Sequence, residues 1–289
     1  MPYLKKIVVF TDLDATLLDP VTYSWEPAIE ALNLLLEINA SLVLVSSKTF
    51  SEMVSIHEAL GFNDPFIVEN GGGIVFGSSS TISPGDLGVE SQLISLGKGR
   101  HKMLSLGANT CTLLNFLKEF SRSIDVPLRS YFEMSMQEIS ELTNLSYVEV
   151  LKSLDRYFDV PFFFVDRVIN TDEQRLVYTA ISKGLNVVRG GRFWHLMGHH
   201  GKGYAVELLL SGYRRKYGAI DTIGLGDSPN DYSFLRHVDH PIILGGMSNP
   251  SLFGYAMPEQ ALKTMRTGPK EWNVTILNHF RSERSRENE

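Results

Sequence analysis

The sequence predicts an α/β protein whose doubly wound, Rossmann-like parallel-sheet core is interrupted by an inserted α+β domain. Short apolar segments alternate with helix-length amphipathic segments near both ends of the chain, a rhythm typical of βαβ units around a parallel sheet. The middle of the chain lacks that rhythm and begins with a segment rich in Gly, Ser and Pro, residues 76–88. With 289 residues, the chain is long enough for two domains.

The N-terminal part of the core begins with an apolar strand, because Ile7 to Phe10 form an unbroken apolar run. A parallel strand buried on both faces has no polar alternation, which fits this run. Amphipathic spacing predicts the helices that follow, and short apolar runs predict the next strands. The predicted order is strand 5–10, helix 27–38, strand 42–45, helix 51–60 and strand 66–68.

The inserted domain is expected at 84–198, which leaves 1–83 and 199–289 for the core. Its mixture of helices and extended runs is typical of an α+β architecture. Its expected helices are 109–123, 136–142, 146–157 and 171–183, and its extended runs are 162–165, 185–189 and 192–197. The core then resumes with helix 203–217, strand 222–225, helix 230–236 and strand 241–244, and the charged tail 281–289 is expected to fray.

Composition narrows the classes of function. The net charge is −6 without a basic tract, which argues against nucleic acid as a partner. The apolar run after Lys5 and Lys6 is too short for a signal peptide, and no stretch approaches the roughly 18 apolar residues of a membrane span. The single cysteine, Cys111, cannot form an internal disulfide, so we expect a cytoplasmic protein. The oligomeric state cannot be inferred.

Two acids follow the first predicted strand in "VVFTDLDATLLD", residues 8–19. Asp12 and Asp14 are two positions apart, so in an extended chain their side chains face the same way. Carboxylates held together repel unless a cation neutralises them, and oxygen ligands suit Mg²⁺. The alternative is a polar turn after a strand. In parallel sheets, ligands bind beyond the carboxyl ends of the strands, which favours a site here.

Other predicted strands and helices bring polar groups to the same edge. Ser46, Ser47 and Lys48 follow the second strand and carry hydroxyl, amide and ammonium groups that suit phosphate oxygens, although serines there could merely cap a helix. Lys202 begins a helix, where a cation is unfavourable unless it meets an anion. Otherwise it would be a solvated lysine.

A third strand-end acid occurs in "IGLGDSPNDYSFL", residues 223–235. Ser228 can cap the following helix, Pro229 suits its first position and Asp231 its first turn. Asp227 has no such structural explanation. A third carboxylate at this edge is what a Mg²⁺ ion near Asp12 and Asp14 would require.

Together these segments resemble the haloacid dehalogenase-like phosphatases, whose signatures are D-x-D-x-T, a strand-end Ser or Thr, a Lys and G-D-x-x-N-D. All four occur here in the family's order, as "DLDAT", Ser46, Lys202 and "GDSPND". Ala15 stands where relatives usually have Gly, so the loop must accommodate a methyl group. The resemblance implies that the insert is an α+β cap domain over the core.

The resemblance also implies a two-step phosphoryl transfer. Asp12 would attack phosphorus to form an aspartyl-phosphate, and Asp14 would protonate the leaving alkoxide and then activate water. Mg²⁺ would be held by the Asp12 side chain, the Asp14 backbone carbonyl and Asp227. Ser46 and Lys202 would hold the phosphoryl oxygens.

Supporting roles follow from the same resemblance. Asn230 and Asp231 would orient metal-bound water or the lysine. A cap must select the substrate, and Arg192 in "RGGRFWHL" could meet a carboxylate with its fork of donors, next to Gly191, which permits close backbone approach. A plain hairpin is the alternative there. Glu69 and Asn70 precede a glycine triplet and either contact ligand or form a turn.

A closer resemblance, through nearly the whole chain, is to the mannosyl-3-phosphoglycerate phosphatases. It implies hydrolysis of a small phosphorylated sugar-glycerate to mannosylglycerate, a compatible solute, with glucose as an alternative sugar. A general sugar-phosphate phosphatase, a phosphomutase and a catalytically inactive binding protein remain alternatives, the last disfavoured by the intact acids and lysine. The resemblance is carried by "YSWEPA" (23–28), "LVSSKT" (44–49), "PFIVENGGGI" (65–74), "GGRFWHL" (190–196) and "TGPKEWN" (267–273).

Overall fold

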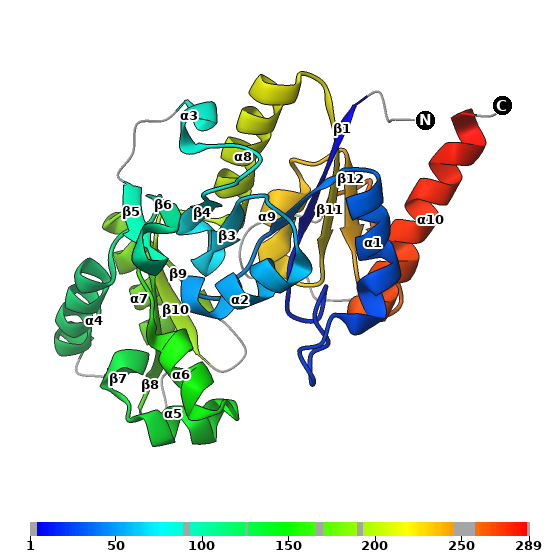
Figure 1. The fold of residues 1–289 in the computed structure, drawn as a ribbon. Coiled ribbons are helices and arrows are strands. Elements are labelled where there is room, and N and C mark those ends of the chain that lie inside the picture. The colour runs from blue at the N-terminus through cyan, green and yellow to red at the C-terminus, as the bar shows by residue number, and fades with distance from the viewer. Residues whose placement is uncertain are drawn as a thin grey trace.

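A five-stranded parallel sheet forms the centre of the core domain (Figure 1). In spatial order its strands are β13 (Leu262–Lys263), β12 (His240–Ile243), β11 (Ile220–Gly226), β1 (Lys6–Thr11) and β2 (Ser41–Leu44). The computed structural model describes residues 5–88, 93–124, 127–165, 170–189, 193–245 and 258–287.

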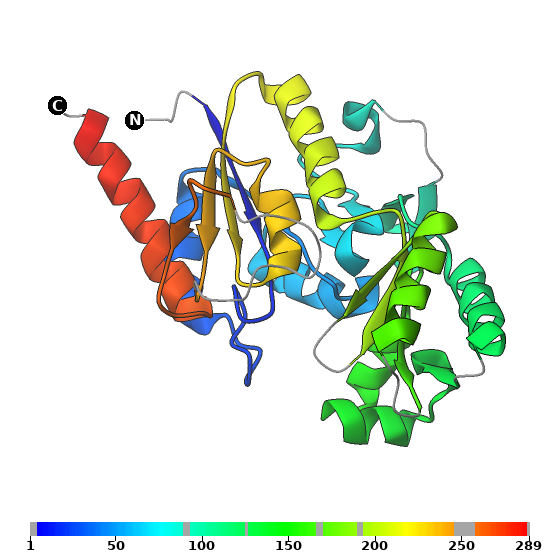
Figure 2. The same cartoon turned by 180° about the vertical axis from the view of Figure 1, so that it is seen from behind.

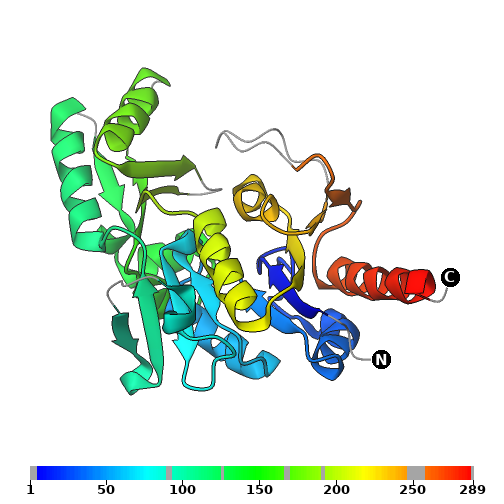
Figure 3. The ribbon, with the colours of Figure 1, turned by 90° about the horizontal axis from the view of Figure 1, so that it is seen from above.

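Helices cover both faces of this sheet. Figure 3 shows α8 and α10 on opposite sides of β1. The side of α10 also carries α1 and α2, and the side of α8 also carries α9. Their bounds are α1 (Ile29–Glu37), α2 (Phe50–Leu60), α8 (Lys202–Tyr217), α9 (Tyr232–Leu235) and α10 (Pro269–Glu287), with single 3₁₀ turns at Glu26–Ala28 before α1 and Pro229–Asp231 before α9.

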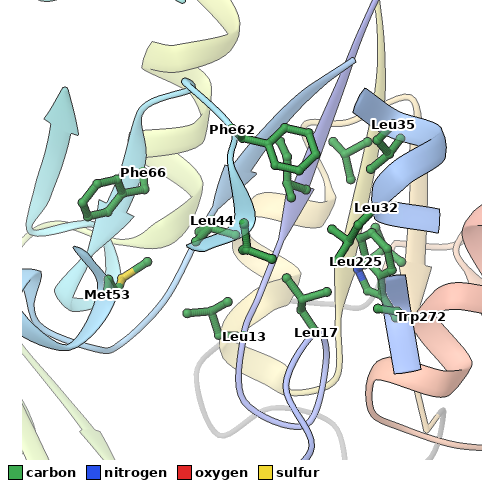
Figure 4. Packing of buried hydrophobic residues seen from close by; sticks show 14 of the residues in the cluster. Leu13, Leu17, Leu32, Leu35, Leu44, Met53, Phe62, Phe66, Leu225 and Trp272 are labelled. Atoms are coloured by element: carbon green, nitrogen blue, oxygen red, sulfur yellow. The ribbon is translucent and has the colours of Figure 1, made fainter. Parts of the chain in front are cut away.

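The apolar side chains of β1 pack on both faces of the sheet. Ile7 and Val9 pack into the cluster beneath α1 and α10, whereas Val8 and Phe10 pack into the cluster beneath α8. Figure 4 shows Trp272 of α10 in the first cluster, which has fully buried leucines from three other elements. Burial on both faces explains why the strand lacks alternation.

A second sheet, antiparallel, adjoins the core through a parallel bridge between Val45 and Ile67. The segment 76–88, which is rich in Gly, Ser and Pro, is not wholly irregular, because a strand continues through Gly77 and a short helix follows. Two strands at 93–105 were not predicted; the second pairs with the strand that ends at Gly77, and the first pairs with the second. The elements are β3 (Phe66–Val68), a 3₁₀ turn (Glu69–Gly71), β4 (Gly73–Gly77), α3 (Pro84–Leu87), β5 (Leu93–Leu96), a 3₁₀ turn (Gly97–Gly99) and β6 (His101–Ser105).

A third sheet, also antiparallel, carries the cap (Figure 2). Its order is β7 (Leu128–Ser130), β8 (Asp159–Phe164), β10 (Trp194–Gly198) and β9 (Leu185–Arg189). Helices α4 and α7 share one hydrophobic cluster with it, and α5 and α6 pack in a smaller one. These helices are α4 (Thr110–Ile124), α5 (Met136–Thr143), α6 (Tyr147–Leu154) and α7 (Asn170–Ser182), and a 3₁₀ turn (Tyr131–Glu133) precedes α5.

The predicted fold class, a parallel-sheet core with an inserted α+β domain, is confirmed. The division at 83/84 and 198/199 remains a prediction. The tail was predicted wrongly, since α10 continues to Glu287 instead of fraying from 281. In the part of the chain that the structure describes, no helix has both the length and the apolar character to cross a bilayer.

Candidate active site

The predicted strand-end residues converge because three parallel strands end in register. Thr11 of β1 pairs with Leu225 of β11 and Leu44 of β2. Beyond that level the Asp12 N–H donates to the Leu225 carbonyl at 2.9 Å, and the Val45 N–H donates to the Thr11 carbonyl at 2.8 Å. The next residues out are therefore Asp12, Ser46 and Asp227, at one edge of the sheet.

A buried lysine joins two of the acids. Lys202, at the start of α8 and 2% exposed, places its Nζ 2.6 Å from Asp12 Oδ1 and 2.7 Å from Asp231 Oδ1. The carboxylate oxygens of Asp12, Asp227 and Asp231 lie within 4.8 Å of one another. One ammonium thus faces three carboxylates.

Burial and that imbalance of charge raise the pKa of two of these acids. Burial, together with Asp231 and Asp227, raises the pKa of Asp12 well above its usual range, although Lys202 opposes the shift. Burial and Asp231 raise the pKa of Asp227 to about 7. Because three ionised carboxylates with one ammonium carry two excess negative charges, a divalent cation fits this donor set, and its oxygen ligands suit Mg²⁺.

Asp231 is committed to positioning. Its Oδ2 accepts from the Asp227 N–H at 3.2 Å and the Ser228 N–H at 3.1 Å, and the Ser228 hydroxyl adds a third bond at 2.9 Å. Its Oδ1 accepts from Lys202. Fully buried and fully bonded, it fixes both the lysine and the loop that carries Asp227.

The side chain of Asp14 lies apart from that cluster. Ala15 adopts a left-handed φ of 57°, and Asp14 Oδ1 lies 2.9 Å from Lys48 Nζ. The same ammonium sits 5.0 Å from the centroid of the Tyr23 ring. Burial lowers the pKa of Lys48, but Asp14 and other neighbouring groups outweigh it, so the net shift is upward.

The segment after β2 is anchored to the turn after β3. The Ser46 hydroxyl accepts from the Lys48 N–H at 3.2 Å, and the Ser46 carbonyl accepts from the Asn70 N–H at 2.9 Å. Ser46 is buried and Ser47 half-buried. The Asn70 side chain in turn meets Asn230 Nδ2 at 3.5 Å, so the structure brings Asn70 and Asn230 together at this edge.

Glu69 has a different environment from the one expected for a ligand contact. Its buried carboxylate accepts from the Phe158 N–H at 2.7 Å and from the Tyr157 N–H at 3.0 Å, where the chain enters β8 of the cap. Burial raises its pKa to about 7, while Arg156 and the two N–H groups oppose that shift. Glu69 therefore binds the cap to the core.

Gly191 and Arg192, the expected cap contacts, lie outside the described residues. Among the described residues, a cavity of about 210 Å³ opens where the core meets α6 of the cap. Its lining includes Tyr23 and Lys48 from the core and Lys152 from the cap. Two ammonium groups thus line a cavity next to Asp14, and the carboxylates of Glu52 and Glu149 line it too.

Sequence reasoning assigned no role to two side chains that the structure places at the site. The Thr16 hydroxyl, the threonine of "DLDAT", is buried 3.4 Å from Asp227 Oδ1. Trp272 Nε1 donates to the Thr11 hydroxyl at 3.0 Å, and that hydroxyl donates to the Asp12 carbonyl at 2.8 Å. The motifs D-x-D-x-T and "TGPKEWN" contained these signals.

Comparison with known proteins agrees with this geometry. A family model described as haloacid dehalogenase-like hydrolase matches residues 9–250. A glucosyl-3-phosphoglycerate/mannosyl-3-phosphoglycerate phosphatase from Persephonella marina is 33% identical over 93% of this chain and 96% of its own. One with the same name from Methanococcoides burtonii is 30% identical over 94% and 96%.

A solved structure supports the fold. A phosphatase of the haloacid dehalogenase superfamily from Bacteroides thetaiotaomicron superposes with a TM-score of 0.63 at 16% identity, over 97% of both chains. At that identity the likeness concerns the arrangement of the elements alone.

Proposed function

The chain belongs to the haloacid dehalogenase-like hydrolases and is a phosphatase, and from this premise we propose that it hydrolyses mannosyl-3-phosphoglycerate to mannosylglycerate and phosphate with Mg²⁺. The observation that carries the chemistry is the contact of Lys202 with Asp12 beside Asp227 and Asp231. The substrate comes from the names of the two relatives, which cover nearly the whole chain.

In the proposed reaction Asp12 Oδ attacks phosphorus, and the bond from phosphorus to the sugar-glycerate oxygen breaks. Asp14 gives a proton to that leaving oxygen. Water then attacks phosphorus and gives a proton to Asp14. The bond from phosphorus to Asp12 breaks, so phosphate is released and the Asp12 carboxylate is regenerated. Bound Mg²⁺, held by Asp12, the Asp14 backbone carbonyl and Asp227, would supply charge neutralisation.

The remaining groups would bind the phosphoryl oxygens and position the nucleophile. Ser46 and Lys202 would hold the oxygens as negative charge shifts onto them, and Asp231 would hold Lys202. Asn230 would orient water near the metal. Ser47, Lys48, Glu69, Asn70, Gly191 and Arg192 were expected to bind substrate; of the described ones, the contacts of Glu69 favour a role in linking the domains instead.

Lys48 gives a reason why a substrate with a carboxylate would suit this site. Its ammonium holds Asp14 in the present structure, and the neighbouring cavity also contains Lys152. A glycerate carboxylate that binds Lys48 would release Asp14 for proton transfer. Plain sugar phosphates lack that group and would leave the ion pair intact.

The test is phosphate release from mannosyl-3-phosphoglycerate, glucosyl-3-phosphoglycerate and plain sugar phosphates at matched Mg²⁺, with and without chelator. We expect the two glycerate substrates to be preferred and the chelator to stop turnover. The glucosyl compound is the second candidate, since both relatives carry both names. Preference for a plain sugar phosphate would refute the substrate, and transfer of phosphate to a sugar without release would indicate a mutase.

A further inference from the structure

Three side chains of types that can bind a metal meet at the amino-terminal end of the core strands, opposite the candidate active site. Asp221 lies near the start of β11, His240 begins β12, and His279 comes from α10. Their ligand atoms lie within 4.8 Å of one another. Asp221 and Asp227 are six residues apart along an extended strand and its end, about 20 Å. The cluster is therefore separate from the carboxylates around Lys202.

The three ligand atoms lie close enough together to bind a single ion. Asp221 Oδ1 lies 3.0 Å from His240 Nε2, and the rings of His240 and His279 meet edge to face with centroids 4.7 Å apart. Ligands at about 2.1 Å from a tetrahedral ion are separated by about 3.4 Å. Small side-chain rotations would therefore accommodate one. The three residues come from three packed elements and are half-buried, which limits the cost of ordering them.

We propose that Asp221, His240 and His279 bind a divalent transition-metal ion of the Zn²⁺ class. Two imidazoles with one carboxylate suit Zn²⁺, Co²⁺ or Ni²⁺, whereas Mg²⁺ prefers an all-oxygen set. His240 and His279 line a cavity of about 980 Å³ between α10, β12 and β13, which would give an ion an entry path and leave room for a water ligand.

The ion would join α10 to the sheet. The same helix carries Trp272, which bonds to Thr11, and Asn273, whose Oδ1 accepts from the Ala31 N–H of α1 at 2.8 Å. An ion bound to the folded chain alone raises the free energy of unfolding. Zinc would therefore stabilise the protein from a position remote from the reacting groups.

The test uses the full chain and ZnCl₂ as the probe, with saturating Mg²⁺ present so that the carboxylates near Lys202 are occupied. Calorimetry and thermal unfolding are measured for the wild type and for His240→Ala, His279→Ala and the control His237→Ala. Co²⁺ in place of zinc reports nitrogen ligands through its visible absorption. His237 is a half-buried histidine outside the cluster, so its loss controls for the removal of an imidazole.

We expect one equivalent of zinc per chain in the wild type and in His237→Ala, with a rise in Tm of several degrees. Each cluster variant should bind zinc at least tenfold more weakly and lose both that rise and the Co²⁺ absorption. Failure of the wild type to bind zinc, or equal affinity in the cluster variants, would overturn the proposal. Because phosphatase activity is not the readout, this result is independent of the substrate assignment.

Discussion

At the scale of single residues, the contact between Asp12 and Lys202 combines two opposing effects. Removing both groups from water is costly, but the 2.6 Å ion pair and the second bond to Asp231 hold the lysine charged, since these acids raise its pKa despite its burial. A carboxylate held this way cannot rotate freely. The geometry favours a nucleophile aimed at one position, which is the arrangement that a covalent phosphoryl transfer needs.

We therefore predict that Asp12→Asn lowers phosphate release by at least about 10³-fold, because it removes the proposed nucleophile at nearly constant volume. The measurement is release of inorganic phosphate from mannosyl-3-phosphoglycerate, with circular dichroism to check folding. Asp172→Asn, in α7 of the cap, is the matched control and should keep wild-type turnover. Turnover within tenfold of wild type in Asp12→Asn would contradict the role.

Ala15 offers a second residue-scale prediction. Its φ of 57° is a left-handed conformation that costs a residue with a Cβ about 1 kcal/mol or more. Ala15→Gly relieves that strain, although it adds flexibility to the unfolded chain. We expect a net gain of up to about 1 kcal/mol in the free energy of unfolding in urea. A loss of stability would show that the methyl group makes compensating contacts.

How well each site residue could be predicted depends on where its partners lie. Asp12, Ser46 and Asp227 follow apolar strands directly, so strand order alone brings them together. Glu69 was expected to contact ligand or form a turn; its contact with the cap could not be predicted, because its partners are backbone N–H groups 88 and 89 positions away that no side-chain pattern reveals. Tyr23 lies beside Lys48 through a loop whose path depends on the left-handed Ala15.

At the scale of elements, the turn after β3 fastens the two domains. Gly71 has a φ of 92°, and a Cβ there would lie 2.3 Å from the Gly201 carbonyl oxygen, so the turn packs directly against the start of α8. Glu69 in the same turn holds the backbone at Tyr157 and Phe158. A Cβ on Gly72 would lie 2.5 Å from the Phe158 side chain, next to β8, so the triplet is explained by close packing within the core at Gly71 and against the cap at Gly72.

This fastening predicts a dependence on pH. The pKa of Glu69 is about 7 in the folded protein and near 4.5 when unfolded, so between these values the folded state binds the extra proton. That stabilisation is complete below pH 4.5 and is lost as the pH rises through 7. The difference is about 3 kcal/mol, at 1.36 kcal/mol for each pKa unit.

Glu69→Gln has no such proton. The stability of the wild type minus that of Glu69→Gln should therefore fall by about 3 kcal/mol between pH 4.5 and pH 8. Urea unfolding of the metal-free proteins across that range measures it, and contributions from other acids cancel in the difference. A pH-independent difference would mean that the Glu69 carboxyl titrates normally.

Through Trp272, the C-terminal helix α10 contacts the end of β1, next to Asp12. Trp272→Phe keeps most of the packing but removes the donor to the Thr11 hydroxyl, which itself bonds to Asp12. We expect a loss of about 1 kcal/mol in unfolding free energy and a lower kcat. Trp25→Phe, at the margin of the same cluster, is the control and should keep kcat. An unchanged kcat in Trp272→Phe would limit the bond to a structural role.

Helix α10 also illustrates why some elements could not be predicted. Its second half is rich in charge and has no apolar stripe in the sequence, so it resembled a frayed tail. In the structure the helix is held by Trp272, Ile276 and Phe280 in the core, and it propagates from that anchor to Glu287. Strand β5 was missed because it has little burial; it pairs with β6, which in turn pairs with β4.

At the scale of the whole molecule, the core and the cap meet at several contacts remote in sequence. Thr49 lies at the N-terminus of core helix α2, and its hydroxyl donates to the Lys152 carbonyl of the cap at 2.8 Å. The Ser51 hydroxyl donates to Asp155 of the cap at 2.5 Å. The parallel core was predictable because its strands are continuous apolar runs. The placement of the cap was not, because these contacts use polar groups and backbone that carry no sequence period.

The acid cluster leads us to predict that the stability of the whole molecule depends on divalent metal. Without a cation, Asp12, Asp227 and Asp231 repel one another and only Lys202 compensates. We predict that Mg²⁺ stabilises the folded protein by about 2.7 kcal/mol at 100 times its Kd, or roughly 5–10 °C in Tm. The measurement is thermal unfolding at pH 8 during a titration with MgCl₂.

Asp227→Asn should raise the Tm of the metal-free protein and reduce the effect of Mg²⁺ on Tm. Removing a carboxylate from the cluster relieves the repulsion, so the metal-free variant should melt above the metal-free wild type at pH 8. The same change removes a ligand, so Mg²⁺ should raise its Tm little. Asp172→Asn, far from the cluster in sequence and fold, should show the wild-type Tm and the full response to Mg²⁺. A full Mg²⁺ response in Asp227→Asn would mean that the ion binds elsewhere. A metal-free Tm below that of the metal-free wild type would mean that repulsion among the three buried acids does not destabilise the fold.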